Sequence, residues 1–491
     1  MIRRTFLKTL LAGAGASVVD AGMAAADAAA RATPAARSNA RKVVVGGAGI
    51  TGLCCGYELM KAGFDVTILE AAGRYGGHVF TGRDGLSDGL YADFGADHIT
   101  RPGYERLLEY AGAFDIPVIP YPNAEGSWLP YNDHDLRTIG GKPYTNRMLA
   151  DPGILAGLGF NGREVRFLSR HPWYGLESLY LRPYVDKIAD PHLPFGIGLD
   201  DLDEIPVAEI YRREGASQAA LEYLGGENTS ALYRIWRLAA KRSRGIPPSE
   251  GETLRLKGGN ERLPIAFARR LGARVKLAHP ITAIRQNDRG VSVGYLAYGH
   301  AGERTVDADF FVSCMSLTVF RNISVTPALS PAKQYVVDNL TYSSHPFYVF
   351  EAGSRFWLDD GLGSINMQFE HPDIFAIWEV PAEVETTRII LKAFGPGGLS
   401  PQRVLAAFRQ VYPGKRDTIV QALTRDWTQD TLAPSCEMEP FPMGQMRRFW
   451  PEVLRPEGRV YFAGTYADLL SRGMESCIRS AQRVAREIQK A

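Results

Sequence analysis

The chain has 491 residues, which at about 150 residues per domain predicts three folding units or one large enzyme of two parts. Hydrophobic residues make up 45% and charged residues 22%, a composition that excludes a disordered chain. The 56 basic residues nearly balance the 54 acidic ones, which excludes a protein built to bind nucleic-acid phosphates. Five cysteines, an odd number, exclude a disulfide scaffold. No apolar run of about 20 residues follows the N-terminal segment, so no membrane span is expected in the mature chain.

The first residues have the pattern of an export signal. The run Arg3-Arg-Thr-Phe-Leu-Lys8 precedes a short apolar stretch and an alanine-rich tail, in which Ala24-Ala-Ala26 offers a small-residue cleavage site. The paired arginines resemble the twin-arginine (Tat) signal, which directs export of proteins that are already folded. We therefore expect residues 1–36 to be a signal peptide and the mature protein to be periplasmic. An amphipathic N-terminal helix is the alternative.

Residues 42–70 have the pattern of a strand, a glycine turn, a helix and a second strand. The short runs Lys42–Gly46 and Asp65–Leu69 are apolar and rich in β-branched residues, which favours buried parallel strands. Between them, Gly47, Gly49 and Gly52 have the G-x-G-x-x-G spacing of a dinucleotide site. These glycines permit a tight turn, close approach of a pyrophosphate to a helix N-terminus, and close packing of helix on strand. Glu70 is then placed to accept hydrogen bonds from ribose hydroxyls, although an ordinary glycine turn is the alternative.

The residues after the second strand suggest which dinucleotide is bound. The segment Glu70-Ala-Ala-Gly-Arg74-Tyr-Gly76-Gly77-His78 resembles the flavin-containing amine oxidase superfamily, which includes monoamine, polyamine and L-amino acid oxidases. The family pattern there reads E-A-R-x-R-x-G-G-R, and the resemblance implies FAD as the cofactor. Ala72 replaces the first arginine of the pattern, and His78 replaces the last, which in the family faces the FAD phosphates. Unlike arginine, a histidine at this position has a charge that depends on pH.

Two later segments strengthen the resemblance. In the family, the pair Gly258-Gly259 would begin a helix, and the following strand, with Val275 at the matching position, would pass the adenine. Gly458–Thr465 matches the last flavin strand, and the helix after it, starting at Gly473-Met474, would point its N-terminus at the flavin N1/C2 edge. The alternatives are a surface αβ unit for the first segment and a plain packing helix for the second.

A third segment bears on how the flavin is held. Trp427 is followed nine residues later by Cys436 and then by Phe441-Pro-Met-Gly444, which looks like the monoamine oxidase segment that carries the cysteine bonded to the FAD 8α carbon. The resemblance makes Cys436 a candidate for a covalent link to FAD. The alternative is a small residue that packs beside the flavin ring.

The expected active site departs from the family at two places. Amine oxidases of this group usually place an aromatic pair facing the flavin ring, and the matching positions here are Glu437 and Gly473. The family also usually has a lysine that holds a water at flavin N5, in a strand shortly before a Phe-Trp pair. The strand before Phe356-Trp357 contains no lysine, and its nearest ionisable residue is His345.

Three ionisable residues are candidates for catalysis. Glu437 would anchor a cationic amine or act as a base if it faces the flavin, and is otherwise a solvated loop carboxylate. His345, before a proline at a strand start, is either catalytic or structural. His98 follows Asp97 where the family runs a loop along the flavin, and we expect it in the active site. The residues expected at the FAD are Gly47, Gly49, Ile50, Thr51, Gly52, Glu70, Ala71, Arg74, Gly76, Gly77, His78, Val79, Gly95, Ala96, Asp97, Val275, Trp427, Cys436, Gly464, Thr465, Gly473 and Met474.

The expected fold is α/β: a discontinuous Rossmann-like FAD-binding domain with a mixed α+β substrate domain, as in the amine oxidases. The insert at 101–250 is expected to be largely helical, and the second insert to supply antiparallel strands over the flavin, such as Phe347–Phe350 and Phe375–Val380. The boundaries we assign are 40–100, 251–320 and 440–491 for the FAD-binding domain, and 101–250 and 321–439 for the substrate domain.

The resemblance implies an FAD-dependent oxidoreductase that removes two electrons from a substrate carbon–hydrogen bond by hydride transfer to flavin N5. An amine or amino acid is the implied small-molecule substrate, and O2 or a periplasmic electron carrier is the implied acceptor. The alternatives are a dehydrogenase or desaturase acting on a C–C or C–O bond, a flavin-binding protein with little turnover, and an NAD-binding protein. The Tat machinery is the expected export partner, and neither nucleic acid nor a metal is expected.

Overall fold

A parallel sheet of five strands carries the predicted nucleotide-binding turn. The computed structural model describes residues 40–125, 133–246, 252–343, 346–380, 382–434, 437–469 and 473–491. The expected signal peptide at 1–36, His345 and Cys436 therefore lie outside the described residues. The strand order is β10-β2-β1-β14-β23, and every pairing in this sheet is parallel. The strands are β1 (Lys42–Gly46), β2 (Asp65–Leu69), β10 (Val275–Lys276), β14 (Phe310–Ser313) and β23 (Val460–Phe462).

The predicted strand–helix–strand unit near the N-terminus is confirmed. β1 and β2 have the expected bounds and are joined through α2 (Ile50–Lys61). The three consecutive valines 43–45 of β1 are all buried, as expected for a parallel strand covered on both faces. Since β23 pairs with β14, which pairs with β1, segments from both ends of the sequence share one sheet.

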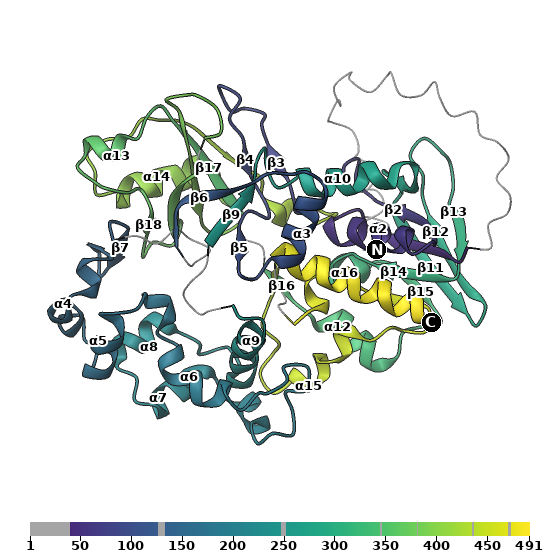
Figure 1. Cartoon of the computed structure of the whole chain (residues 1–491), viewed down its shortest axis with the longest axis horizontal. Helices are drawn as coiled ribbons and strands as arrows, with labels where there is room; N and C mark the ends of the chain where they lie inside the picture. Colours follow the sequence, from purple (N-terminus) through teal and green to yellow (C-terminus); the bar gives the residue numbers. More distant parts are fainter. Residues whose placement is uncertain are drawn as a thin grey trace.

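The last helix, α16 (Gly473–Lys490), lies along α2 on this sheet (Figure 1). Its buried residues include Met474, Ile478, Ala481 and Ile488, and this helical spacing gives the single apolar face that the sequence predicted. The helices α3 (Glu105–Ala113) and α10 (Arg262–Leu271) pack against α16 and α2 respectively.

Smaller sheets connect this layer to the rest of the chain. A four-stranded sheet has the order β13-β12-β11-β15, and a three-stranded sheet has the order β5-β9-β6. Two short pairs are β3 with β4 and β16 with β22. The strands are β3 (Thr81–Gly82), β4 (Ala92–Asp93), β5 (Ile99–Arg101), β6 (Val118–Glu125), β9 (Glu252–Leu256), β11 (Ile281–Asn287), β12 (Gly290–Tyr295), β13 (Arg304–Ala308), β15 (Ser324–Thr326), β16 (Tyr342–Ser343) and β22 (Glu437–Met438).

A seven-stranded sheet supplies the other wall of the site. Its order is β21-β17-β20-β19-β18-β7-β8, and all its pairings are antiparallel except that of β18 with β7. The predicted antiparallel strands are confirmed as β17 and β19, and α14 (Pro401–Val411) packs on β17 and β21. The strands are β7 (Leu136–Ile139), β8 (Lys142–Thr145), β17 (Phe347–Ala352), β18 (Met367–Gln368), β19 (Ala376–Val380), β20 (Ile389–Phe394) and β21 (Ile419–Thr424).

The insert at 101–250 is less helical than the sequence suggested. Its helices lie between residues 148 and 246, apart from α3, and form a separate layer in Figure 1. Residues 118–125 instead form β6, and residues 136–145 form the hairpin of β7 and β8. Gly140 and Gly141, both at positive φ, make the turn of that hairpin. The helices of the layer are α4 (Pro152–Gly157), α5 (Gly162–Leu168), α6 (Ser178–Val185), α7 (Val207–Arg213), α8 (Gln218–Leu224) and α9 (Ala231–Ser243).

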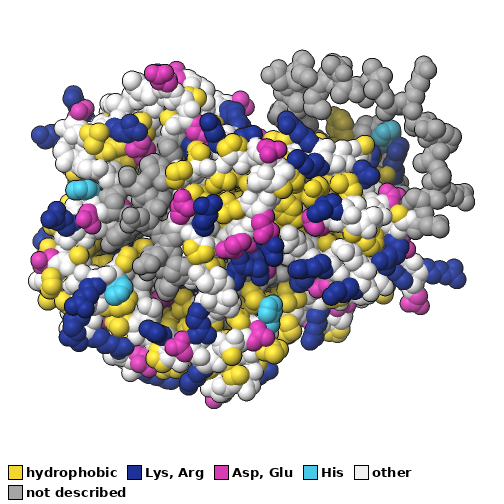
Figure 2. All heavy atoms as spheres, viewed as in Figure 1, with side chains coloured by type: hydrophobic (Ala, Val, Ile, Leu, Met, Phe, Trp, Pro, Cys, Tyr) yellow, Lys and Arg dark blue, Asp and Glu magenta, His cyan; other side chains and the backbone are white. Residues whose placement is uncertain are grey.

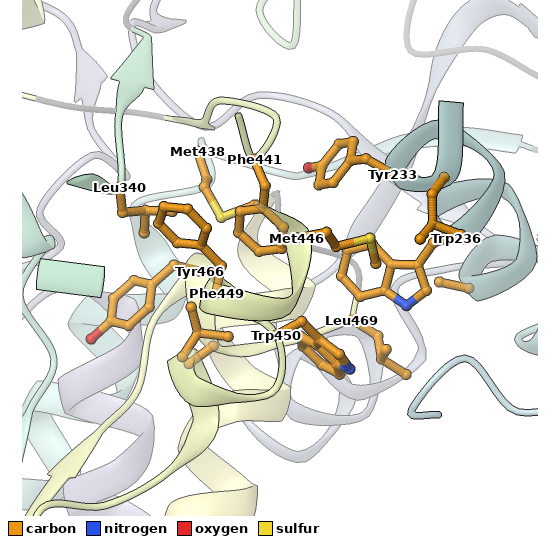
Figure 3. Close-up of a cluster of buried hydrophobic side chains, with 14 of the residues drawn as sticks. Tyr233, Trp236, Leu340, Met438, Phe441, Met446, Phe449, Trp450, Tyr466 and Leu469 are labelled. Atoms are coloured by element: carbon orange, nitrogen blue, oxygen red, sulfur yellow. The ribbon is translucent and has the colours of Figure 1, made fainter. Parts of the chain in front are cut away.

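An aromatic cluster attaches this helical layer to the C-terminal part of the chain (Figure 3). Trp236 of α9 has its ring centroid 4.9 Å from that of Trp450, and Tyr233 has its centroid 5.2 Å from that of Phe441. Phe441 in turn stacks on Phe449 at 4.9 Å. Edge and stacked contacts of this kind add to the burial energy of the rings, so the helical layer is fixed to the segment that leads into β23.

The surface carries both signs of charge. On the face shown in Figure 2, lysine and arginine side chains are interspersed with aspartate and glutamate, in keeping with the near-zero net charge. Within the described ranges, no helix has both the length and the apolar character needed to cross a bilayer.

Candidate functional site

Residues from both ends of the sequence line one continuous, large cavity. Its volume is about 1520 Å³, and it runs from the turn after β1 to the seven-stranded sheet and the helical layer. Small-molecule sites usually measure about 300–1,000 Å³, so this cavity has room for a dinucleotide and a second molecule. The residues predicted at the cofactor or for catalysis that line it are Gly47, Gly49, Ile50, Thr51, Glu70, Ala71, Arg74, Gly76, Gly77, His78, Val79, Gly95, Ala96, Asp97, His98, Trp427, Gly464, Thr465, Gly473 and Met474.

The glycine turn after β1 and the turn at Gly76-Gly77 pack directly backbone against backbone. Gly49 forms a parallel bridge with Gly76, and a Cβ on Gly77 would lie 3.3 Å from the Gly49 Cα. A Cβ on Gly52 would lie 1.9 Å from the carbonyl oxygen of Gly47, so only glycine fits there. The first turn of α2 has no side-chain cap and no acidic residue, and its N-terminus faces the cavity. These backbone N–H groups and the helix dipole favour an anionic group such as a pyrophosphate.

Glu70 ends β2 at the edge of the cavity. Its Oε2 accepts a hydrogen bond from the Ala48 amide at 2.5 Å, and its Oε1 accepts one from the Ala72 amide at 2.8 Å. Burial raises the pKa of Glu70, while the two amides and the Arg74 guanidinium oppose that rise. The carboxylate is therefore held in one position beside the glycine turn, where a ribose hydroxyl would donate to it.

His78 lies against the ring of Trp427, with the two ring centroids 4.4 Å apart. Its Nε2 lies 2.6 Å from the Ala433 carbonyl oxygen, which can only accept, so Nε2 carries the proton and Nδ1 is left as an acceptor. Nδ1 is buried and has no hydrogen-bond partner among the described residues. Burial lowers the pKa of His78 to about 4, so the ring is neutral at pH 7 and cannot supply the charge of the arginine that it replaces.

Two arginines supply positive charge beside His78. Arg74 donates to the carbonyls of Tyr75 at 3.1 Å and Gly77 at 2.6 Å. The guanidinium of Arg425 lies 4.3 Å from the Trp427 ring centroid and pairs with Asp430 at 3.1 Å. Burial, with repulsion from Arg425, lowers the pKa of Arg74. Both guanidinium groups therefore lie on the wall of the cavity beside the neutral His78 ring.

Comparison with known proteins assigns the chain to a family. The family model described as flavin containing amine oxidoreductase matches residues 50–489. The chain belongs to this family. Among curated relatives, an L-amino-acid oxidase of Vipera ammodytes ammodytes is 26% identical over 473 residues, which cover 92% of this chain and 94% of that protein. An L-amino acid oxidase of Bothriechis schlegelii is 25% identical over 480 residues, covering 93% of this chain and 91% of that protein.

Solved structures show the same architecture. A putrescine oxidase with putrescine bound superposes with a TM-score of 0.73 at 19% identity, covering 92% of this chain and 99% of that one. Cyclohexylamine oxidase from Brevibacterium oxydans IH-35A superposes with a TM-score of 0.72 at 21% identity, with the same coverage. The α/β amine oxidase fold expected from the sequence is therefore confirmed, and the protein is an FAD-dependent oxidoreductase.

A buried charge cluster underlies the loop of this amine oxidoreductase that was expected along the flavin. Lys392 of β20 is fully buried, and its Nζ lies 2.8 Å from the Asp97 carboxylate and donates to the Asp93 carbonyl at 2.6 Å. The same Nζ lies 3.7 Å from the ring centroid of Phe347. The Asp97 carboxylate also lies 3.3 Å from His98 Nδ1, so the cluster fixes the His98 ring at the cavity wall. Burial and the nearby Asp97 raise the pKa of Asp93 to about 7.

The start of α16 lies at the cavity wall. Gly473 has φ of +76°, and a Cβ there would lie 2.2 Å from the Tyr104 hydroxyl oxygen, so a side chain at this position is excluded. Glu475, in the same turn, points away to α3, where it accepts from the amides of Leu107 at 3.0 Å and Arg106 at 3.3 Å. Burial raises the pKa of Glu475 to about 7.

The remaining predicted residues lie elsewhere. Gly52 packs behind the turn, and Val275 sits in β10 beside Ile68; neither lines the cavity. The backbone of Glu437 pairs with Ser343, which lines the cavity, but the side chain of Glu437 is not among those described. His345 and Cys436 lie outside the described residues.

Three residues at or near the cavity were missed by the sequence analysis: Lys392, Arg425 and Arg137. Each lies in a segment without a motif and reaches the site through sheet pairing or through a loop that folds back. For Lys392 the signal was a lone lysine in the apolar strand Ile389–Phe394, a residue that is costly to bury without a partner. Arg425 and Arg137 had no comparable signal.

The residues present fit FAD. The glycine cradle, the fixed Glu70 and the two arginines at the cavity wall match the pyrophosphate and ribose of a dinucleotide, and the second helix N-terminus, at Gly473, faces the same cavity. When bound, FAD supplies the acceptor for the two electrons taken from the substrate. The protein supplies the binding, the exclusion of water and the placing of polar groups around the substrate.

Proposed function

We propose that this protein oxidises an amine or an amino acid at the carbon–nitrogen bond, with FAD as cofactor and O2 as electron acceptor. The observation that carries the proposal is the shared cavity, in which the cradle for the nucleotide opens directly onto a wall formed by the substrate domain. The names of the relatives, which are oxidases of L-amino acids, putrescine and cyclohexylamine, support this substrate class.

His98 is the described residue best placed to handle the proton of the substrate amine. Its ring lies at the cavity wall, 5.8 Å from the ring of Trp378, which also lies 5.8 Å from Phe347. Asp97 lies beside Nδ1, and Lys392 holds Asp97, so the imidazole is fixed as a base or hydrogen-bond donor for the amine. Glu437 and His345 stay predictions for the same role.

Anaerobic bleaching of the holoenzyme is the direct test. A panel of primary amines and amino acids is mixed with the protein, and loss of flavin absorbance is followed before and after air is admitted. The proposal expects bleaching by members of the panel, release of ammonia with a carbonyl product, and recovery with hydrogen peroxide when air enters. Bleaching only by alcohols or by saturated C–C substrates would favour a dehydrogenase, and no bleaching at all would favour a binding protein with little turnover.

Reoxidation in air also distinguishes O2 from a periplasmic carrier as the electron acceptor. The relatives are named as oxidases, which supports O2, and a bleached enzyme that recovers in air within turnover time agrees with that. A bleached enzyme that stays colourless in air but recovers with a soluble quinone or cytochrome would point to a periplasmic carrier instead.

The attachment of the flavin is a separate part of the proposal. Cys436 follows Trp427 with the spacing quoted above, and Trp427 is buried at the cavity with its Nε1 donating to the Phe94 carbonyl at 2.9 Å. If Cys436 bonds the flavin, acid precipitation leaves the colour on the protein, and Cys436→Ala releases it. Colour that washes off the unmutated protein would show that the flavin is held without a bond.

Export by the Tat route to the periplasm is proposed from the N-terminal run alone. Replacing Arg3 and Arg4 together by lysine should leave the protein in the cytoplasm with its flavin bound, because the twin-arginine route reads both arginines. Fractionation of cells that make each form measures this. Equal periplasmic yields of the two forms would contradict the proposal.

A further inference from the structure

The cavity wall formed by the seven-stranded sheet is one straight row of side chains. Phe347 pairs with Phe394, Phe394 with Ala376, Ala376 with Gln368, and Gln368 with Arg137, so these residues lie in register across five neighbouring strands. Residues paired across a sheet place their side chains on the same face. All five line the cavity.

The two ends of this row differ in chemistry. The Phe347 end lies beside Lys392 and, through Trp378, beside His98, which follows the segment expected along the flavin. The opposite end is Arg137, which borders the helical layer. Strands lie about 4.8 Å apart, so Arg137 is ~10 Å from Ala376 and ~19 Å from Phe347 measured across the sheet. The row therefore runs from the redox end of the cavity to a distant cation.

Arg137 is held in place by aromatic rings. Its guanidinium lies 5.1 Å from the ring centroid of Trp173 and 5.1 Å from that of Tyr223, both of which line the cavity. Burial raises the pKa of Tyr223, and both the charge of Arg137 and its hydrogen bond to the Tyr223 side chain oppose that rise. Cation–π contacts of this geometry orient a guanidinium without neutralising it.

No carboxylate of the described residues pairs with Arg137. Its Nε is buried and has no hydrogen-bond partner in the described part of the chain, and it takes part in none of the ion pairs found there. The nearby Glu177 is already paired with Arg234 at 2.6 Å. Arg137 is half-buried at the cavity wall and has no carboxylate partner among the described residues, so an anion bound in the cavity would pair with it.

We propose that Arg137 binds a carboxylate of the substrate, at the far end of a carbon chain whose other end carries the amine that is oxidised. The inference rests on the proposed amine oxidation. The planar fork of arginine matches a carboxylate with two parallel hydrogen bonds, and Gln368, next to Arg137 in the row, offers a further polar contact. The substrate class is thus an amino acid with its carboxylate several bonds away from the reacting carbon.

The test uses the holoenzyme and matched pairs of substrates. Straight-chain ω-amino acids from aminobutanoate to aminooctanoate are compared with their carboxamides, which have the same length and no charge. The wild-type enzyme is expected to show a KM about 10-fold or more lower for the acid than for the amide at the preferred length. Arg137→Gln is expected to raise KM for the acid by about 10- to 100-fold, with little change in kcat, and to leave the amide unchanged.

Two further variants complete the design. Arg137→Lys keeps the charge but loses the planar guanidinium, so its KM for the acid should lie between those of the wild type and of Arg137→Gln. Arg147→Gln removes an exposed arginine that does not line the cavity, and should behave as wild type. Equal KM values of the wild-type enzyme for acid and amide would overturn the inference. So would an Arg137→Gln enzyme in which KM rises equally for both substrates.

A binding measurement tests the carboxylate site independently of amine oxidation. Hexanoate and hexanamide carry no amine and cannot react, so their effect on the flavin spectrum reports binding alone. Tighter binding of hexanoate in the wild type, lost in Arg137→Gln, supports the carboxylate site even if no amine bleaches the flavin. Equal binding of both probes counts against it even if amines are oxidised.

Discussion

At the scale of single residues, Lys392 is the side chain on which the wall of the site depends. Its amino group is buried away from water, between the Asp97 carboxylate and the carbonyl of Asp93. Burial lowers the pKa of Lys392, which shows the cost of keeping the ammonium there. That cost is offset only while the Asp97 carboxylate stays beside it.

Lys392→Met should therefore destabilise the fold by about 3–5 kcal/mol, because it removes the ammonium that pairs with the buried Asp97 carboxylate. Adding Asp97→Asn should recover part of that loss, since both members of the pair are then neutral. Urea unfolding followed by fluorescence measures both effects. A free energy of unfolding for Lys392→Met within about 1 kcal/mol of wild type would show that the ion pair contributes little to stability.

Arg425 is expected to supply the positive charge that the arginine of the family pattern would carry at position 78, where this chain has a neutral histidine. Arg425→Gln should weaken FAD binding about 10-fold and reduce its dependence on salt, because one cation is removed from the wall beside His78. Flavin fluorescence on titration of the apoprotein measures both quantities. Arg416→Gln, which removes an exposed arginine that does not line the cavity, is the control and should bind FAD as wild type does.

The sequence identified the nucleotide-binding glycines because their spacing is local, and the structure brings almost all of them to the cavity. It could not identify Lys392 or Arg137, since their roles arise from strand register between segments far apart in the chain. Nor could it show that His78 is neutral, because that follows from burial under Trp427.

At the scale of elements, the packing of α2 on β1 depends on a glycine. Gly52→Ala should abolish FAD binding and destabilise the fold by several kcal/mol, because the new Cβ would overlap the Gly47 carbonyl. Gly112→Ala makes the same change in α3, where nothing lies within 4 Å, and should be neutral or stabilising by up to about 1 kcal/mol. Thermal unfolding with and without FAD compares the two, and similar losses in both would contradict the steric argument.

The contact between α16 and α3 should depend on pH through Glu475. Its pKa in the folded protein, about 7, lies above its ordinary value of 4.5, so the folded state binds the proton more tightly than the unfolded state. The stability that this gives is complete below about pH 4.5 and is lost as the pH rises through about 7. Glu475→Gln stays neutral and keeps the acceptor for the Leu107 amide, so it lacks this loss.

The difference in Tm between wild type and Glu475→Gln should therefore shift in favour of the variant between about pH 5 and pH 8. Other titrating groups act equally in both proteins and cancel in the difference. Tm curves that run parallel over this range would show that Glu475 is ionised throughout.

The elements themselves were largely predictable where a helical or alternating period was strong, as in β1, α2, β2 and α16. The hairpin of β7 and β8 was not, because none of the residues in Leu136–Ile139 and Lys142–Thr145 is buried. β7 joins the sheet by pairing with β18, a partner that local sequence does not reveal, and β8 pairs with β7.

At the scale of the whole molecule, FAD should act as a bridge between segments that are distant in sequence. Removal of FAD should lower the stability by RT ln(1 + [FAD]/Kd), about 2.7 kcal/mol at a concentration 100 times the Kd. Hydrogen exchange at the start of α2 and at the start of α16 should slow together when FAD is restored, while α5, outside the cavity, stays unchanged. Protection at only one of the two helix starts would contradict a shared site.

The mixed order of the parallel sheet also has a consequence during synthesis. Its strands come from stretches that begin at Lys42, Asp65, Val275, Phe310 and Val460, and the wall at Gly473 follows the last of them. A nascent chain cannot hold the nucleotide between both walls until Gly473 has been synthesised, so cofactor loading has to wait for all five strands and the start of α16.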